Sequence, residues 1–448
     1  MVRTSKRWLL TVLTTQMALL GQPDLILIGA KVLTADATRP ATEAVAVAGE
    51  RIQAIGLGNE IRSLAGPKTR IVDLRGRTVI PGLMDAHVHL LVGSMITDEG
   101  SLRAYERGVL PKQMASFIRH GVTTIRSTAD PLPYIAQIRD RLQRDQLTGP
   151  RLLITGPTPC SPGGHPATTV CRDNLFCRQG VSRELDSEEQ ARQLVRELVR
   201  ANVDAVKVTL ENRFPVNPKV QLLPDAVLAA LVDETHRSRR RIIAHAPITK
   251  HFVEMGIDEF VHLYGTATEA SEMAAVLVHQ NIPVTTTLSI GDAYRDTTGG
   301  ERNVWGTPYS PRMRQSFEDT LKPTGKLRIF ADAGVKLVVG TDWNDGADWA
   351  RTDDVRLDDA RLAAGAETLH EMELLRRAGL STQAILTAAT RNAAEAFGII
   401  DRVGTIAQGK IADMVILDGD LLQDFSTLRR PVAVVKAGRI VHGALPDR

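Results

Sequence analysis

The chain has 448 residues, which is long enough for one large domain and a smaller one. Its composition, 43% hydrophobic and 24% charged, is that of an ordinary globular protein. The 55 basic residues nearly balance the 52 acidic ones, so the net charge of +3 gives no reason to expect a nucleic acid or an anionic membrane as a partner.

The first 22 residues are predicted to be a signal peptide. Arg3, Lys6 and Arg7 precede an apolar run at 8–20, which is shorter than the about 20 apolar residues that a membrane-spanning helix needs. This pattern favours a secreted or periplasmic protein without a membrane span. The alternative is an N-terminal extension of a cytoplasmic protein, because the run contains polar residues and lacks a clear small-residue cleavage site.

Both ends of the mature chain, residues 23–80 and 401–448, consist of short strand-like segments. In chain order these segments are 24–33, 44–47, 51–56, 412–418 and a hairpin at 431–441. Neither end has enough residues for a core of its own. We therefore expect both ends to pair into one small β-sandwich domain.

The middle of the chain, residues 81–400, alternates short apolar strands with amphipathic helices. Including one strand that overlaps its start, the candidates are 78–86, 123–127, 151–155, 205–208, 241–245, 259–262, 283–287 and 335–340. Eight such units in about 320 residues predict an α/β fold of the TIM type, a (β/α)8 barrel.

Polar side chains recur at the ends of these strands. They are His87 and His89 after the first strand, Lys207 in the fourth, His245 and His262 at the ends of the fifth and sixth, and Asp342 after the eighth. Each has a structural explanation on its own, such as a satisfied histidine or a turn-capping aspartate. Because active sites of such barrels lie at the carboxyl ends of the strands, their shared position predicts a metal centre.

This arrangement resembles the amidohydrolase superfamily, in particular its imidazolonepropionase-like and Xaa-Pro-dipeptidase-like branch. The resemblance begins near residue 24 and rests on 81–89, 121–124, 206–208, 244–246, 340–342, 389–394, 404–413 and the loop Gly163-Gly164-His165. The chain departs from the branch at Pro247 and Ile248, and at Leu263. In that branch these positions border the substrate, so the specificity is expected to differ from that of common members.

The resemblance implies two divalent metal ions. His87, His89 and Asp342 would bind the first ion and His245 and His262 the second. Lys207, carboxylated by CO2, would bridge them, since a carbamate is an anionic ligand whereas an ammonium would repel cations. The alternative is an unmodified lysine beside a single metal ion. Imidazole and carboxylate ligands without a thiolate favour Zn²⁺, with manganese, cobalt and iron left open.

The reaction that the resemblance implies is hydrolysis of a C–N amide bond, in a dipeptide or an N-acyl amino acid. A hydroxide held between the metal ions would attack the carbonyl group, with Asp342 as general acid and base. Alternatives are hydrolysis of a lactone, a carbamate or an organophosphate ester at the same centre, and a metal-free scaffold protein. We expect a small-molecule substrate and, from the resemblance, a homo-oligomer.

Candidate substrate contacts are His165, Tyr264 and Trp343, with packing as the alternative role of each. His165 is also a candidate for shaping the oxyanion site. The loop at 292–300 is expected to be a lid or a subsite because it is polar and rich in glycine. A substrate carboxylate has three candidate ligands, which are Arg126, Arg295 and Arg302.

The chain has three cysteines, Cys160, Cys171 and Cys177. In an exported protein, the simplest disulfide joins Cys171 to Cys177, and free loop thiols are the alternative.

Overall fold

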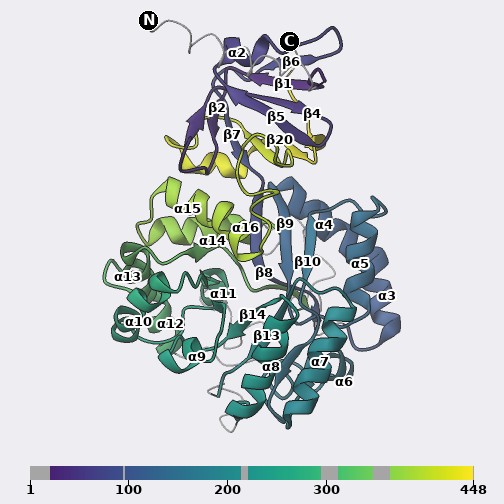
Figure 1. Ribbon diagram of the computed structural model, residues 1–448, viewed down its shortest axis with the longest axis vertical. Helices are drawn as coiled ribbons and strands as arrows, with labels where there is room; N and C mark the ends of the chain where they lie inside the picture. Colours follow the sequence, from purple (N-terminus) through teal and green to yellow (C-terminus); the bar gives the residue numbers. More distant parts are fainter. Residues whose placement is uncertain (1–20, 94–95, 213–219, 294–310, 347–363, 447–448) are drawn as a thin grey trace, which may run out of the picture. The chain divides into compact units, whose positions relative to one another are not determined.

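The computed structural model describes residues 21–93, 96–212, 220–293, 311–346 and 364–446 (Figure 1). Nearly all of the predicted signal peptide, most of the loop at 292–300, and the candidates Arg295 and Arg302 lie outside the described residues. The chain forms two compact units, one from the residues up to 82 and from 399 onwards, the other from residues 83–398.

The first unit consists of two β-sheets built from both ends of the chain. One sheet has the order β5-β4-β1-β6 and the other β21-β20-β19-β7-β2-β3. Their strands are β1 (Leu25–Ile28), β2 (Lys31–Leu33), β3 (Ala41–Thr42), β4 (Ala44–Ala48), β5 (Arg51–Gly56), β6 (Arg70–Asp73), β7 (Thr78–Pro81), β19 (Met414–Leu417), β20 (Pro431–Lys436) and β21 (Arg439–Gly443). The short helices are α2 (Gly58–Arg62) and the 3-10 helix η1 (Phe425–Arg429).

Strand pairing and one shared core join the two ends of the chain in this unit. Strand β19 pairs antiparallel with β7, so a C-terminal strand lies directly beside an N-terminal one. One apolar cluster takes side chains from both sheets, including Leu27 and Val45 of the first and Val79 and Ile416 of the second. The two sheets thus share the core that neither end could form alone.

The second unit contains two parallel sheets. The first has the order β10-β9-β8-β18 and the second β13-β14-β15-β16-β17. Their strands are β8 (Leu83–Gly93), β9 (Val122–Ser127), β10 (Arg151–Ile154), β13 (Ala205–Thr209), β14 (Arg241–His245), β15 (Glu259–Val261), β16 (Val284–Thr285), β17 (Leu337–Val338) and β18 (Trp343–Gly346). A further small sheet pairs β11 (Thr158–Cys160) with β12 (Ser182–Glu184).

Main-chain hydrogen bonds join the two parallel sheets at both ends. The amide of Ala86 in β8 donates to the carbonyl of Val339, just beyond β17, at 2.9 Å. At the other end, the amide of Asp204, just before β13, donates to the carbonyl of Ile154 in β10 at 2.8 Å. These two hydrogen bonds link β8 to the segment after β17, and β10 to the segment before β13.

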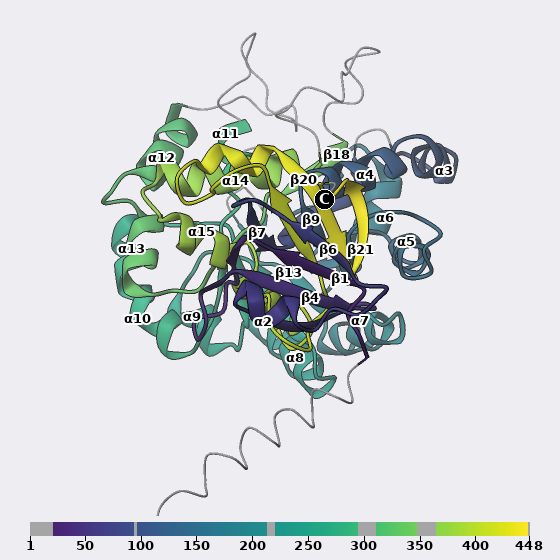
Figure 2. The same ribbon diagram turned by 90° about the horizontal axis from the view of Figure 1, so that it is seen from above.

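Helices surround these strands, as Figure 2 shows. They are α3 (Glu99–Gly108), α4 (Leu110–Arg119), α5 (Tyr134–Gln143), α6 (Leu175–Val181), α7 (Glu188–Arg200), α8 (Asp225–Arg237), α9 (Lys250–Glu254), α10 (Ala267–His279), α11 (Leu288–Ala293), α12 (Pro311–Leu321), α13 (Lys326–Ala333), α14 (Ala366–Arg377), α15 (Thr382–Ala388) and α16 (Arg391–Ala396). Helix α7 is typical, because it buries Ala191, Leu194, Val195 and Leu198 at helical spacing.

Among the described residues, no helix is long and apolar enough to cross a membrane.

Three predicted strands differ from the observed ones. The segment 78–86 is two strands, β7 in the first unit and β8 in the second. The segments 283–287 and 335–340 shorten to the two-residue strands β16 and β17. The chain turns out of the extended conformation at Thr287 (φ 48°) and Asp342 (φ 61°), beyond these two strands. Strand pattern alone does not reveal where such a turn begins.

A disulfide joins Cys171 to Cys177, which confirms the expected pairing. Both cysteines are buried in a small apolar cluster with Val92 and Val181. Cys160 is a buried free cysteine, and burial raises the pKa of its thiol to about 12. Since the thiolate is the reactive form, Cys160 is an inert core residue.

Candidate metal centre

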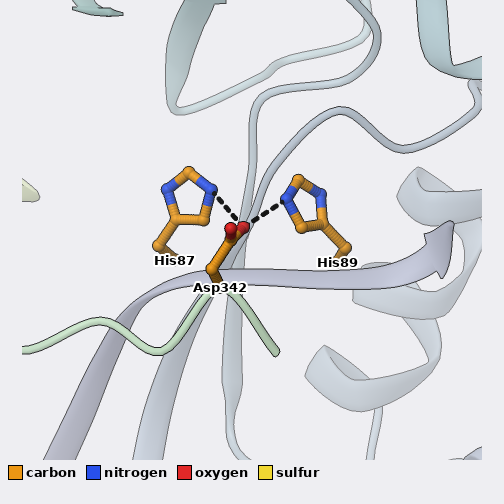
Figure 3. Close-up of side chains that lie close together, drawn as sticks. All are labelled: His87, His89 and Asp342. Atoms are coloured by element: carbon orange, nitrogen blue, oxygen red, sulfur yellow. Dashed lines mark hydrogen bonds and ion pairs between the residues drawn. The ribbon is translucent and has the colours of Figure 1, made fainter. Parts of the chain in front are cut away.

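Two histidines of β8 and one aspartate from the β17 end form a close group (Figure 3). His87 and His89 are one residue apart, so their side chains leave the strand on the same face. Oδ1 of Asp342 lies 3.2 Å from Nε2 of His87 and 2.9 Å from Nε2 of His89. The amide of Asp342 donates to the carbonyl of His87 at 2.8 Å, which holds the aspartate against β8.

The hydrogen bonds of His89 leave a lone pair pointing at a carboxylate. Its Nδ1 lies 2.6 Å from the carbonyl oxygen of Thr128, and a carbonyl oxygen only accepts, so Nδ1 carries a hydrogen. In neutral His89 the other nitrogen, Nε2, then has a lone pair 2.9 Å from Oδ1 of Asp342. Two electron-rich atoms at this distance need a cation between them, either a proton or a metal ion.

A second pair of histidines follows β14 and β15. Nδ1 of His245 lies 2.9 Å from Nε2 of His262. Each ring has a partner on its other nitrogen, with Oγ1 of Thr287 at 2.7 Å from His262 and Oε2 of Glu211 at 2.7 Å from His245. Two inward nitrogens from neighbouring strands are therefore held side by side, as in the imidazole half of a metal site.

Lys207 lies beside the first group. It is buried in β13, and its Nζ lies 2.9 Å from Nε2 of His87. The rings of His87 and His262 are 5.3 Å apart between centroids, so the two histidine groups are adjacent. Burial lowers the pKa of Lys207 to about 7 because an ammonium is poorly solvated in the interior. A large share of this lysine is thus a neutral amine near neutral pH.

The charges of the centre suit a divalent cation. Burial lowers the pKa of His87 and of His262 well below the usual value, so both rings are neutral and can offer a nitrogen lone pair. Burial acts to raise the pKa of Asp342, but its contacts with His87 and His89 outweigh burial and hold this pKa well below its usual value. Neutral imidazoles around an anionic carboxylate fit a metal ion such as Zn²⁺.

Two of the three candidate substrate contacts lie beside the second histidine pair. The ring of His165 is 4.8 Å from that of His245, and the hydroxyl of Tyr264 is 2.9 Å from Nε2 of His245. The third, Trp343, is buried and packs edge-on against Phe117 at 5.6 Å between ring centroids. Its position matches the packing alternative.

Arg126 is engaged inside the unit. Its guanidinium forms a fully buried ion pair with Glu259, and its Nε donates to the carbonyl of Ala86 at 3.0 Å. Thr285 donates to the same carboxylate at 2.7 Å. The arginine is therefore committed to structural contacts and is unavailable to a substrate carboxylate.

The sequence did not reveal the residues that hold the histidine rings. Thr128, Thr287 and Glu211 each lie just beyond a strand end, and each contacts a histidine from a different strand. Their position after β9, β16 and β13 was a usable signal, because the ends of neighbouring parallel strands meet at one edge. Threonine and glutamate at such positions are common, however, and their partners are fixed only by the fold.

Residues 78–441 match the model of the Amidohydrolase family. Imidazolonepropionase of Symbiobacterium thermophilum is 26% identical over 84% of this chain and 83% of its own length. Imidazolonepropionase of Mesorhizobium japonicum is 24% identical over 80% of this chain and 81% of its own.

Solved structures with the same fold include a Xaa-Pro dipeptidase with bound methionine in the active site, with a TM-score of 0.72, 18% identity and coverage of 94% of this chain and 100% of that one. Ochratoxinase of A. niger has a TM-score of 0.73 at 20% identity, over 94% of this chain and 96% of its own. Because the family model covers most of the sequence, the predicted resemblance is confirmed and the chain belongs to the amidohydrolase family.

Proposed function

We propose that this protein hydrolyses a C–N amide bond of a dipeptide or an N-acyl amino acid with the help of two divalent metal ions, most simply Zn²⁺. The observation that carries the proposal is the contact between His89 and Asp342. The carbonyl of Thr128 leaves the His89 lone pair facing a carboxylate oxygen at 2.9 Å, a geometry that calls for a cation. His87 beside it and the pair of His245 and His262 supply further inward nitrogens.

Lys207 is the proposed bridge between the two metal ions. Only a neutral amine reacts with CO2, and burial lowers the pKa of this lysine to about 7, so the reactive form is available near neutral pH. The resulting carbamate would carry a negative charge beside His87. A negatively charged group suits a ligand that bridges two metal ions, whereas an ammonium would repel both cations.

In this proposal Asp342 moves the proton. The bound metal ions would supply polarisation of the substrate carbonyl and acidification of water. Asp342 is anionic, since its contacts with His87 and His89 hold its pKa well below the usual value. It can therefore accept a proton and pass it to the leaving amine. His165 and Tyr264, which flank His245, are the proposed substrate contacts.

The fold supports the same proposal. We propose that the eight strands β8–β10 and β13–β17 close into a (β/α)8 barrel, because backbone hydrogen bonds connect both ends of the two parallel sheets. In such a barrel the carboxyl ends of the strands face one mouth. Three proposed ligands, His245, His262 and Asp342, lie at or beyond such a strand end. The other three lie within strands, Lys207 in β13 and both His87 and His89 in the long strand β8.

The substrate class is tested with zinc-loaded protein and a panel of dipeptides, N-acyl amino acids, lactones, carbamates and organophosphate triesters. We expect the highest kcat/KM for an amide, with Lys207→Ala inactive as the control. A clear preference for an ester, a carbamate or a phosphotriester would overturn the amide assignment while keeping the metal centre. Folded protein that binds no metal and cleaves nothing would support the scaffold alternative.

We also propose that the protein is exported. The basic, then apolar, N-terminal pattern is supported by the disulfide between Cys171 and Cys177, since disulfides persist mainly in oxidising compartments. Expression with a C-terminal tag and cell fractionation tests this. Mature protein shortened by about 20 residues in the periplasm or medium is expected, and full-length protein in the cytoplasm would contradict export.

A further inference from the structure

Glu211 lies two residues beyond β13 and turns its carboxylate toward the second histidine pair. Its Oε2 is 2.7 Å from Nε2 of His245, and the hydroxyl of Tyr264 donates to the same oxygen at 3.4 Å. The side chains of Glu211 and His245 are only 14% and 10% exposed. Solvent screening of this contact is therefore weak.

The contact decides which nitrogen of His245 carries the hydrogen. An ionised carboxylate only accepts hydrogen bonds, so Nε2 of a neutral His245 is the protonated nitrogen beside Glu211. The hydroxyl of Tyr264, 2.9 Å from the same Nε2, then donates to the carboxylate. Nδ1 is then left with its lone pair, and this is the atom 2.9 Å from Nε2 of His262. Glu211 thus selects the tautomer that offers a lone pair toward the interior of the centre.

The other histidines have weaker partners on the outward side. His89 faces the carbonyl of Thr128, and His262 faces the hydroxyl of Thr287, both of which are neutral. Within the part of the chain that the structure describes, His245 alone of these rings has a carboxylate on its outward nitrogen. A hydrogen bond to a charged group is about twice as strong as a neutral one, and it makes the ring a more basic ligand.

We propose that Glu211 is a positioning residue that strengthens metal binding by His245 and His262 without affecting the group of His87, His89 and Asp342. The inference rests on the proposed metal centre. Among the described residues, the hydrogen bonds of the Glu211 carboxylate go to His245 and Tyr264, and none goes to the first group. The effect of removing this carboxylate is therefore confined to one of the two metal ions.

Stepwise removal of Zn²⁺ by a chelator tests this selectivity. In Glu211→Ala, one of the two ions is expected to bind about 10- to 100-fold more weakly, and the other with unchanged affinity. Glu211→Gln is expected to lose less, because its amide oxygen still accepts a hydrogen bond but carries no charge. Glu254→Gln is the matched control, since Glu254 is an exposed glutamate on α9. Unchanged affinity of both ions, or equal weakening of both, would overturn the proposal.

The tautomer is measured on metal-free protein, which separates this inference from the proposed function. ¹⁵N NMR of labelled histidines is expected to show His245 protonated at Nε2 in the wild type, and a mixture of tautomers in Glu211→Ala. The His245 signal is assigned by its loss in His245→Gln. A wild type with Nδ1 protonated would overturn the role of Glu211. A wild type with the expected tautomer that binds no Zn²⁺ would instead refute the proposed metal centre.

Discussion

Three histidines of the centre use their two ring nitrogens for different contacts. His89, His245 and His262 each use one nitrogen to contact a fixed partner and turn the other toward the shared interior. The outward contact leaves the second nitrogen of each ring available as a ligand. It also fixes the rotation and the tautomer of the ring before any metal ion binds. The centre is therefore prepared by its surroundings and does not depend on the metal ion to assemble it.

Asp342→Asn tests the proton-transfer role at this scale. An amide has nearly the shape of the carboxylate but cannot accept the proton, so kcat is expected to fall by roughly 10²- to 10⁴-fold or more. Metal content is expected to persist largely, because His87 and His89 remain. The measurement is kcat together with metal ions per chain. Near-normal turnover in this variant would refute the assignment of Asp342 as acid and base.

Glu367 in α14 is expected to make the stability of the folded protein depend on pH. Its Oε2 is buried without a hydrogen-bond partner among the described residues, and burial raises its pKa from 4.5 to about 8. The folded state therefore holds this proton more tightly than the unfolded state. The stability contributed by the neutral acid is present below pH 4.5 and is lost as the pH rises to about 8.

Glu367→Gln removes this dependence. Between pH 4.5 and 8, the unfolding free energy of the wild type is expected to decline relative to the variant by up to roughly 1.4 kcal/mol per pH unit. Urea unfolding at a series of pH values measures the difference, with the exposed Glu254→Gln as control. A difference between wild type and Glu367→Gln that stays constant with pH would contradict the prediction.

The sequence shows which residues can meet at one site more readily than it shows their contacts. Strand alternation places His87 and His89 on one face, and strand ends place His245, His262 and Asp342 at one edge, so these residues follow from local pattern. The contact of Glu211 with His245 follows from the three-dimensional structure alone, because His245 comes from the neighbouring strand, 34 residues away.

At the scale of the elements, a buried ion pair ties together strands that are not neighbours. Arg126 of β9 and Glu259 of β15 meet inside the second unit, and Arg126 also reaches β8 through the carbonyl of Ala86. The guanidinium lies 4.8 Å from the centre of the Phe397 ring. Each charge depends on the other, because both side chains are almost completely buried.

Breaking this pair is expected to destabilise the protein. Arg126→Met leaves Glu259 buried without its cation and is expected to cost about 3–5 kcal/mol of unfolding free energy, measured in urea. The double variant Arg126→Met, Glu259→Leu is expected to recover most of the loss, since no unpaired charge remains. Glu254→Ala, at an exposed pair with Lys250, is expected to change stability by less than about 0.5 kcal/mol. Equal losses in the single and double variants would contradict this account.

The predicted strands 283–287 and 335–340 were too long for a reason that concerns the site. Thr287 and Asp342 adopt positive φ angles beyond β16 and β17, and His262 does so beyond β15. At these three positions the chain leaves the sheet and turns a functional side chain inward. A β-rich sequence pattern cannot show this change, because tertiary hydrogen bonds such as Asp342 N to His87 O determine it.

At the scale of the whole molecule, the order of elements along the chain predicts the α/β fold and the terminal β-strands. The alternation of strands and helices in 81–400 gives parallel sheets surrounded by helices, and the apolar strands at both ends give sheets that share one core. The spacing of elements carries this information without any detail of packing. The substrate does not follow from the fold, because enzymes of one fold differ in their loops.

We propose that two divalent metal ions are held by His87, His89, Lys207, His245, His262 and Asp342, and the number of metal ions bound per chain checks this. Elemental analysis of folded, zinc-loaded protein is predicted to give two ions per chain for the wild type. One ion per chain is predicted for a double variant that replaces His245 and His262 with alanine. Folded wild-type protein that retains no metal ion would show that these residues do not form a metal centre.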